Sequence, residues 1–514
     1  MLFRRQTLDR TTRPRLRRLA GTAAALAIAV SLALSGCSGS GSDDATGGRD
    51  ATVRVGLVLE PTSLDIRTQA GAALDQVLID NVYQGLVGRT QTGGIRDVLA
   101  TGHTVSDDGL TYTFTLRRGV TFQDGTPLTA ADVAWSLDDV RQHADTYIDG
   151  DDLAAVVNVA APDDATVVLT LARPDSDLLF DLTGRAGLVL ERGAGNDRSH
   201  TANGTGPFRV SSWKQGDALT FVRNEDYWGP KAKVATVVFR YITQPSTAVN
   251  AMANGDLDVE TAVNGTLKGQ LEDAPGITLK TGRTTDKYTL AFNDAKAPFT
   301  DVRVREAIRK AIDPKAIIAA IGGAGVEQGG PIPSLDPGYQ DLTSIDAYDP
   351  AGARKLLQQA GMTDLHLTLT YANVYPATIG DVLTSQLKKV GITLDVKRVD
   401  FTTWLDQVFQ GKDFDLSMVN HAEARDIGNW ANPDYYFGYD DAQVQQLYAD
   451  SIATTDPTQK EADLRQAAKL ISEDAAGEWL FTATAITAIR DGVTGFPTSS
   501  TTTRLNLADL AVAR

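Results

Sequence analysis

Polar side chains that could recognise a solute are concentrated between Asn420 and Asp434, a segment with few aliphatic residues. His421 offers an imidazole that can ligate a metal ion. Arg425 offers a guanidinium that grips a carboxylate through two hydrogen bonds, and Asp426 offers a carboxylate that forms a charge-assisted bond with an ammonium. These groups predict a binding site for a small polar solute. The alternative is a surface loop in which Arg425 and Asp426 are only solvated.

Aromatic side chains near this segment extend the same prediction. Trp404 precedes it and Trp430 lies within it, and such rings stack on sugars or line side-chain pockets. Asn420 adds an amide at the start of the segment. Two alternatives stay open: aromatic residues are often core residues, and His421 can be a hydrogen-bonding loop residue rather than a ligand of a metal chelate.

A second group of residues resembles an acyl-transfer site but has the wrong local structure. Ser211 and Lys214 have the spacing of the serine and lysine in β-lactamases, and Lys280-Thr281-Gly282 matches their second signature. Activation of the serine needs the lysine one helical turn away, whereas residues 208–213 alternate as a strand does. The five histidines also lack zinc-ligand spacing. We therefore predict no catalysis, and a serine hydrolase is the distant alternative.

Three aspartates at Asp149, Asp151 and Asp152 could suggest a calcium site. A calcium-binding EF-hand loop needs oxygen ligands, a glycine and a closing glutamate at fixed offsets, and these offsets are absent. The segment is predicted to be a solvated turn. We predict no metal site and no cofactor.

The elements that must position the polar segment alternate between strand and helix. The expected order is strand 365–371, helix 377–390, strand 392–399, helix 403–410 and strand 414–419. An earlier helix has clear end signals, with Asp349 as its N-cap, Pro350 at its first position and Gly361 after its end. This β-α-β-α-β succession predicts right-handed crossovers and a mainly parallel sheet. Ligands bind beyond the carboxyl ends of such strands, which is where the polar segment begins.

The N-terminal region predicts export and attachment to a membrane. Arginines lead an apolar run from Ala20 to Leu34, which is typical of a secretory signal and short for a transmembrane helix. The following Leu34-Ser35-Gly36-Cys37 resembles the bacterial lipobox, in which the cysteine is lipidated and becomes the mature N-terminus. The alternative is an ordinary signal with an incidental cysteine. Residues 38–50 have the composition of a flexible spacer.

The net charge argues against nucleic acid as a partner. The chain has a formal net charge of −16, and removing residues 1–36 takes away seven arginines and Asp9, which leaves about −22. Phosphate backbones bind to clustered lysine and arginine, so we predict no nucleic-acid binding.

After a strand at 53–57, residues 77–87 carry apolar residues at helical spacing and predict a helix.

Several segments together resemble the extracellular solute-binding proteins of family 5, the oligopeptide, dipeptide and nickel receptors of ABC importers. The segments are Asn81-Val82-Tyr83-Gln84-Gly85-Leu86, residues 107–136 (DDGLTYTFTLRRGVTFQDGTPLTAADVAWS), residues 204–229 (GTGPFRVSSWKQGDALTFVRNEDYWG) and residues 288–313 (YTLAFNDAKAPFTDVRVREAIRKAID). The resemblance implies an α/β, two-lobed periplasmic-binding-protein-like fold of type II, of the large cluster with an extra subdomain, and with a hinge between the lobes. It covers residues from about 52 to the C-terminus.

The resemblance also implies a domain order. Residues 1–36 are expected to be the signal peptide and 37–50 the linker after lipidated Cys37. Lobe I is expected over 51–287 with the extra subdomain at about 82–200, lobe II over 288–484, and a return to lobe I over 485–514. The expected protein is a monomeric receptor, tethered by lipid outside the cell membrane, that captures a peptide-like solute for the permease of an ABC importer.

The resemblance suggests two sets of contacts with the solute. Peptide-binding members place an aspartate for the ligand's α-ammonium four residues before a proline; counting back from Pro433 gives Asn429, whose amide cannot form that charge-assisted bond. Asp426 could replace it if the loop carries an insertion. The extended segment from Thr68 to Ala72, which includes Ala70 and Gly71, matches the strand that pairs with bound peptide. The departure at Asn429 leaves an oligosaccharide or a metal chelate as the alternative solute.

Overall fold

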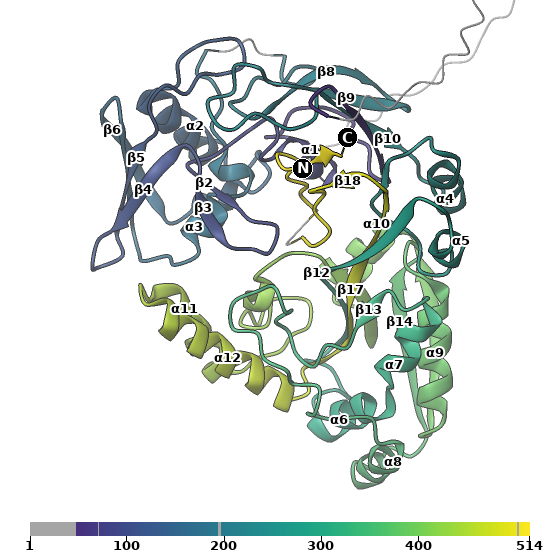
Figure 1. The fold of residues 1–514 in the computed structure, drawn as a ribbon. Helices are drawn as coiled ribbons and strands as arrows, with labels where there is room; N and C mark the ends of the chain where they lie inside the picture. The colour runs from purple at the N-terminus through teal and green to yellow at the C-terminus, as the bar shows by residue number, and fades with distance from the viewer. Residues whose placement is uncertain (1–47, 70, 194–196, 501–502, 514) are drawn as a thin grey trace, which may run out of the picture. The chain divides into compact units, whose positions relative to one another are not determined.

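Two long antiparallel strands, β12 (Ile277–Phe292) and β17 (Gly477–Arg490), run through the middle of the fold (Figure 1). The computed structural model describes residues 48–69, 71–193, 197–500 and 503–513. The two strands pair from Ile277 opposite Arg490 to Ala291 opposite Gly477. They belong to one mixed sheet with the strand order β15-β14-β16-β12-β17-β11-β1-β10-β9-β8. We call the elements on the β1 side lobe I and those on the β14 side lobe II.

Lobe II is built on three parallel strands, β14 (Leu365–Ala372), β15 (Ile392–Val399) and β16 (Leu416–His421). Helix α9 (Ala377–Lys388) connects the first two, and Gly391 follows it with a φ of +91° that favours glycine. The predicted parallel arrangement is confirmed for these strands. The sheet as a whole is mixed, because β12 runs antiparallel to both β16 and β17.

Lobe I surrounds β1 (Thr52–Leu57), which lies parallel to β10 (Thr236–Tyr241) and β11 (Val259–Glu260). The hairpin of β8 (Phe208–Lys214) and β9 (Ala218–Arg223) extends the sheet beyond β10. Apolar residues at alternate positions of these strands are fully buried, as period-two burial requires. Both lobes therefore contain their own apolar core, and β12 and β17 connect them.

A separate four-stranded antiparallel sheet forms a further unit next to lobe I. Its strands follow the order β4 (Ala100–Val105), β5 (Thr111–Leu116), β7 (Thr166–Leu171) and β6 (Val156–Asp163). Helix α2 (Ala130–Gln142) packs against β6 and β7, and its Asp132 carboxylate accepts hydrogen bonds from the Thr129 amide and hydroxyl. We call this unit the subdomain.

The other elements are shorter or lie on the surface of the lobes. The helices are α1 (Ala73–Leu78), α3 (Leu178–Asp181), α4 (Pro245–Asn254), α5 (Gly269–Glu272), α6 (Val302–Ala311), α7 (Pro314–Ala320), α8 (Pro350–Gln359), α10 (Phe401–Trp404), α11 (Ala442–Ala453) and α12 (Pro457–Glu473). The strands are β2 (Val87–Arg89), β3 (Ile95–Asp97), β13 (Gly325–Val326), β18 (Val493–Thr494) and β19 (Ala511–Val512). None of the helices in the described ranges has the length and apolar character needed to cross a bilayer.

Two of three local predictions were wrong. The predicted helix 77–87 ends early, because α1 stops at Leu78 and Asp80 adopts a φ of +67°. Hydrogen bonds from the Asn81 amide to Val77 and Leu505 hold the following turn in place. The predicted helix at 403–410 is confirmed, although its form changes, since α10 ends at Trp404 and residues 405–410 continue as a π-helix. Finally, the described residues around 68–72 form turns and no strand.

Candidate functional site

A cavity of about 440 Å³ lies between the end of β16 in lobe II and the junction of lobe I with the subdomain. Solute sites in proteins are of this size. Lobe II contributes Ala422, Glu423 and Ala424, the residues directly after β16, as the rule for open α/β sheets predicts. We call it the acidic cavity. Its remaining lining residues are Gly71, Ala72, Asp75, Ile79, Arg89, Ile148, Asp149, Asp152, Phe180, Asp181, Gly184, Arg185, Thr503 and Arg504.

Arg185 organises one wall of the acidic cavity. Its Nε donates to Asp75 Oδ1 at 2.6 Å, while Nη1 and Nη2 donate to the carbonyl oxygens of Gln69 and Gly71 at 2.5 and 2.6 Å. Arg185 is buried, so these bonds hold the turn around Gly71 firmly against the subdomain. The carbonyl oxygen of Gly71 is therefore already engaged within the chain, although the residue lines the cavity.

Two carboxyl groups in this wall have strongly raised pKa values. Burial, followed by the charges of Asp149 and Asp151, raises the pKa of Asp152 to about 7. Burial, followed by the charge of Asp152, raises the pKa of Asp181 to about 8. Carboxylates that are close together and partly removed from water oppose each other's ionisation. The cavity therefore disfavours additional negative charge along this wall.

Lys287 neutralises the predicted binding residue Asp426. The Lys287 Nζ lies 2.9 Å from Asp426 Oδ1 and also donates to the carbonyl oxygens of Thr285 and Glu423. Lys287 is opposite His421 in the pairing of β12 with β16, which brings the ammonium to the end of β16. All three N–H groups of the ammonium thus have acceptors. A solute ammonium could reach Asp426 only by displacing Lys287.

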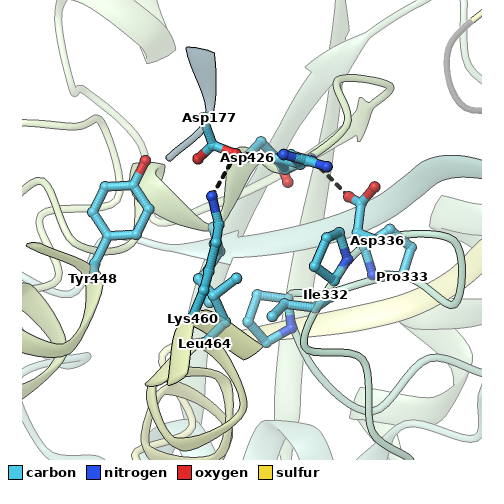
Figure 2. Close-up of a pocket in the computed structure, with 12 residues that line it drawn as sticks. Asp177, Ile332, Pro333, Asp336, Asp426, Tyr448, Lys460 and Leu464 are labelled. Carbon is cyan, nitrogen blue, oxygen red and sulfur yellow. Dashed lines mark hydrogen bonds and ion pairs between the residues drawn. The ribbon is translucent and has the colours of Figure 1, made fainter. Parts of the chain in front are cut away.

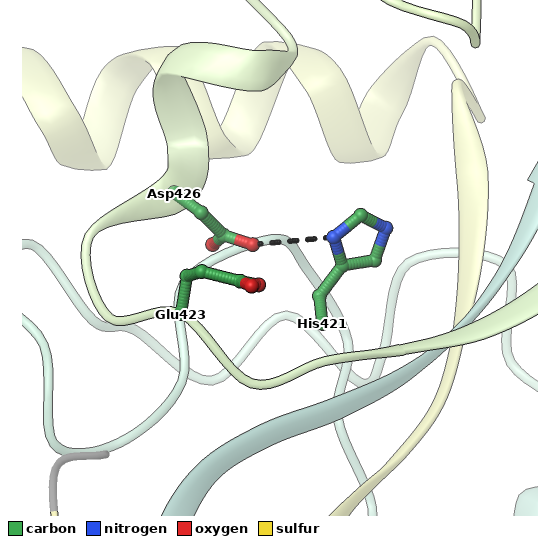
Figure 3. A group of neighbouring side chains, drawn as sticks. All are labelled: His421, Glu423 and Asp426. Atoms are coloured by element: carbon green, nitrogen blue, oxygen red, sulfur yellow. Dashed lines mark ion pairs between the residues drawn. The ribbon is translucent and has the colours of Figure 1, made fainter. Parts of the chain in front are cut away.

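His421, Glu423 and Asp426 form a group whose potential ligand atoms lie within 4.8 Å of one another (Figure 3). His421 Nδ1 lies 3.6 Å from Asp426 Oδ2, and burial, followed by the charge of Lys287, lowers the His421 pKa to about 4. The donor types suit a transition metal. The Lys287 ammonium, however, already occupies the cation position beside Asp426. These residues therefore fit an internal ion pair better than a metal ion.

The other predicted site residues lie in different surroundings. Trp404 and Trp430 are each 4% exposed and belong to the apolar core of lobe II, where Trp404 donates to Ser417 and Trp430 stacks on Phe437. Asn420 lies on β16, and Asn429 ends the 3-10 turn that begins at Asp426; neither lines the acidic cavity. Ala70 and Cys37 lie outside the described residues.

Arg425 belongs to a contact between lobe II and the subdomain. Figure 2 shows Asp177 and Lys460 of this contact pointing toward each other. Arg425 Nη1 and Lys460 Nζ lie 2.5 and 2.7 Å from the same oxygen of Asp177, at the start of α3. The amide of Ser176 also donates to the carbonyl of Ile452 at the end of α11. We call these residues the interlobe latch. The space left between them is about 10 Å³, room for one water molecule, so the latch is a contact and not a solute cavity.

A second cavity of about 350 Å³ shares Thr503 with the acidic cavity. Hydroxyl and backbone groups of β17 and residues 497–500 line it, and Asp286 is its one acidic residue among the described lining groups. The Thr484 hydroxyl is buried there and has no partner in the described structure. The acidic cavity therefore has a neighbour with little charge, whose lining combines hydroxyl groups with apolar residues such as Ile486 and Phe496.

Ser211 and Lys214 have no catalytic arrangement. Both lie on β8, the register shifts between Val210 and Ser212, and Lys214 Nζ pairs with Asp217 at 3.0 Å. The sequence predicted a strand at residues 208–213 and used it to argue against a hydrolase; this strand is confirmed.

Sequence reasoning missed Lys287, Arg89, Asp181 and the interlobe latch. The partners of Lys287 lie up to 139 positions away, and those of Asp177 lie 248 and 283 positions away, so no local pattern links them. Asp149 and Asp152 were noticed, but as part of a solvated turn. The predicted turn is present, yet it lines the acidic cavity. Three aspartates within four residues were a usable signal for this wall.

Comparisons with known proteins agree with this geometry. The family model for bacterial extracellular solute-binding proteins, family 5 Middle, matches residues 94–470. The probable D,D-dipeptide-binding periplasmic protein DdpA of Escherichia coli K12 is 28% identical over 86% of this chain and 90% of its own length. Among solved structures, DppA of Helicobacter pylori in complex with the peptide STSA has a TM-score of 0.75 at 23% identity, covering 91% of this chain and 99% of that one. NikA of Brucella suis in complex with Fe(III)-EDTA has a TM-score of 0.81 at 21% identity, covering 90% and 100%.

Proposed function

Because the chain belongs to family 5 of the bacterial extracellular solute-binding proteins, we propose that it is the receptor that presents a peptide-like solute to the permease of an ABC importer. Membership makes it an extracytoplasmic binding protein and not an enzyme. The observation that carries the proposal is the acidic cavity, which is lined by residues 71–72 of lobe I and 422–424 of lobe II. A solute held there contacts both lobes at once.

The structure supports binding by closure of the two lobes. Strands β12 and β17 are the long connections between the lobes, and the interlobe latch joins them again at the subdomain. Closure removes the solute from water and lets both lobes contribute contacts, so the bound state is the closed one. The proposed lobe boundaries at residues 287 and 484 both fall inside these two strands.

Peptide-like solutes are favoured over the other candidates. DdpA and DppA are named for dipeptide binding or solved with a bound peptide, whereas a metal chelate is bound by NikA. The group of His421, Glu423 and Asp426 argues against a chelate here, because Lys287 already neutralises it. Trp404 and Trp430, the residues suggested for an oligosaccharide, are buried in the core of lobe II.

We also propose that the mature protein is a monomer anchored to the outer face of the cell membrane by a lipid on Cys37. The support is the Leu34-Ser35-Gly36-Cys37 sequence after an apolar run, followed by a polar spacer. A single lipid-modified residue would keep the binding lobes near the permease without a membrane-spanning helix.

Native mass spectrometry of the full-length gene product, extracted from the membranes of its own host, tests both proposals. We expect the protein mass of residues 37–514 plus a diacylglycerol-type modification, and a set of bound peptide masses that are released on denaturation. An unmodified chain in the soluble fraction would contradict the anchor. A single sugar or chelate mass in place of peptides would contradict the peptide-like solute.

A further inference from the structure

The carboxylates of the acidic cavity differ in whether a cation of the chain contacts them directly. Asp75 pairs with Arg185 at 2.6 Å. Asp149, Asp152 and Asp181, in contrast, have no ion pair or side-chain hydrogen bond with any residue that the structure describes. Asp149 directly precedes the 3-10 turn at 150–153, Asp152 lies on that turn, and Asp181 ends α3. We call these three residues the acidic wall.

The members of the acidic wall repel one another. The charge of Asp149 contributes to the raised pKa of Asp152, and the charge of Asp152 contributes to that of Asp181, in each case after burial. A cation placed between them would favour their ionised forms and remove this repulsion. The cavity thus carries charge that a solute could neutralise.

Arg89 provides a second and independent indication of a ligand in the same cavity. Its side chain is only 4% exposed and its guanidinium lies 3.7 Å from the centre of the Phe180 ring. The Nε and Nη2 groups donate to Thr183 Oγ1, but Nη1 has no acceptor among the described atoms. A buried N–H group without an acceptor is costly. An oxygen atom of a solute would complete this site when the lobes adjust around it.

We propose that the acidic wall is a cation subsite, which selects solutes that carry an amino or guanidino group in addition to the single α-ammonium of an ordinary peptide, and that Arg89 receives a carboxylate or carbonyl oxygen of the same solute. The proposal rests on the proposed function and adds the charge class of the solute. An organic cation fits better than a bare metal ion, because the cavity of about 440 Å³ has room for a solute and a metal ion would not satisfy Arg89.

The acidic wall is a different cation site from Asp426, the residue that the sequence suggested for binding an ammonium. That carboxylate pairs with Lys287 and does not line the acidic cavity, whereas the three residues of the acidic wall line it from the subdomain. The proposal therefore predicts that charge selectivity follows Asp152 and Asp181 and not Asp426.

Isothermal titration calorimetry at pH 8 on the full chain from its own host, dialysed free of solute, tests the subsite. The probes are the tripeptides Ala-Lys-Ala, Ala-Ala-Ala and Ala-Glu-Ala, together with spermidine. We expect Ala-Lys-Ala to bind at least tenfold more tightly than Ala-Ala-Ala, and Ala-Glu-Ala to bind more weakly. In the double variant Asp152→Asn, Asp181→Asn, Ala-Lys-Ala and Ala-Ala-Ala should bind within twofold of each other. The matched control is Asp151→Asn, an exposed neighbour that does not line the cavity.

The outcomes separate this proposal from the proposed function. Equal affinity for the lysine and alanine peptides would overturn the cation subsite and leave a peptide receptor. Binding of spermidine alone, lost in the double variant, would support the subsite and contradict a peptide-like solute. Failure of all four probes to bind would contradict both. Because Asp→Asn removes repelling charges, we expect the double variant to fold, which circular dichroism would verify.

Discussion

At the residue scale, the structure contains buried carboxyl groups whose charges have no partner. Glu260 on β11 is 1% exposed; its Oε2 has no hydrogen bond among the described atoms, and its Oε1 accepts only a long bond of 3.4 Å from the Ala262 amide. Burial raises the pKa of Glu260 to about 7. The folded protein therefore holds a proton that the unfolded chain loses near pH 4. The contribution of Glu260 to the free energy of unfolding therefore falls as the pH rises from about 4 through 7.

We predict that Glu260→Gln stabilises the protein at pH 8 and has little effect near pH 4. Glutamine keeps the shape and has no charge to bury, so it avoids a cost on the order of 3 kcal/mol that follows from the raised pKa. Thermal unfolding midpoints measured at the two pH values would show the difference. Glu272→Gln, on the exposed surface of α5, serves as the control and should change neither midpoint. A lower midpoint for Glu260→Gln at pH 8 would contradict the prediction.

At the element scale, local end signals predicted helices well when no distant contact intervened. Helix α8 begins after Asp349, which accepts hydrogen bonds from the amides of Ala351 and Gly352, and Pro350 occupies its first position. Gly361 follows its end with a φ of +74°. The predicted helix at 77–87 failed because Asn81 bonds to Leu505 of the C-terminal segment, which is a contact that no local signal encodes.

We predict that Asp349→Ala lowers the free energy of unfolding by about 1 kcal/mol, because two amides at the start of α8 lose their acceptor. Asp349→Asn keeps an acceptor oxygen and should lose less. Urea unfolding followed by circular dichroism would measure both changes. Asp364→Ala, an exposed substitution after the same helix, is the control. Equal losses for the alanine and asparagine variants would show that the cap contributes little.

At the scale of the whole molecule, the interlobe latch decides how the subdomain and lobe II meet. Burial opposes ionisation of Asp177, but the charges of Lys460 and Arg425 outweigh it and lower the pKa of this carboxyl group. The groups are 11–20% exposed, so water screens them only partly. Removing the carboxylate leaves two cations facing each other, which would favour separation of the lobes.

We predict that Asp177→Asn opens the solute-free protein and weakens solute binding by roughly tenfold, which corresponds to about 1.4 kcal/mol. Small-angle X-ray scattering would show a larger radius of gyration, and calorimetry with the co-purified solute would report the affinity. Asp217→Asn disrupts an exposed ion pair with Lys214 inside lobe I and is the matched control. An unchanged radius together with unchanged affinity would mean that the latch does not hold the lobes.

The sequence by itself determined the features that depend on neighbouring residues. Period-two burial, helix caps such as Asp349 and the parallel strands of lobe II follow from short patterns, and the family segments are also local. It also indicated that the segment after β16 reaches the site, because strand order places the carboxyl ends of the strands together.

Only the tertiary structure decided which charges neutralise one another. The sequence predicted that Asp426 can bind a solute, but β12 places Lys287 beside it. The sequence also predicted that Arg425 can bind a carboxylate of the solute, but Arg425 pairs with Asp177 at the start of α3. Asp152 looked like a residue of a solvated turn until the subdomain placed it in the acidic cavity. Residue type sets the charge of a side chain, but the energy between two charges depends on their distance and burial. Which carboxylates of this receptor lack an ion-pair partner is therefore decided only when distant segments come together.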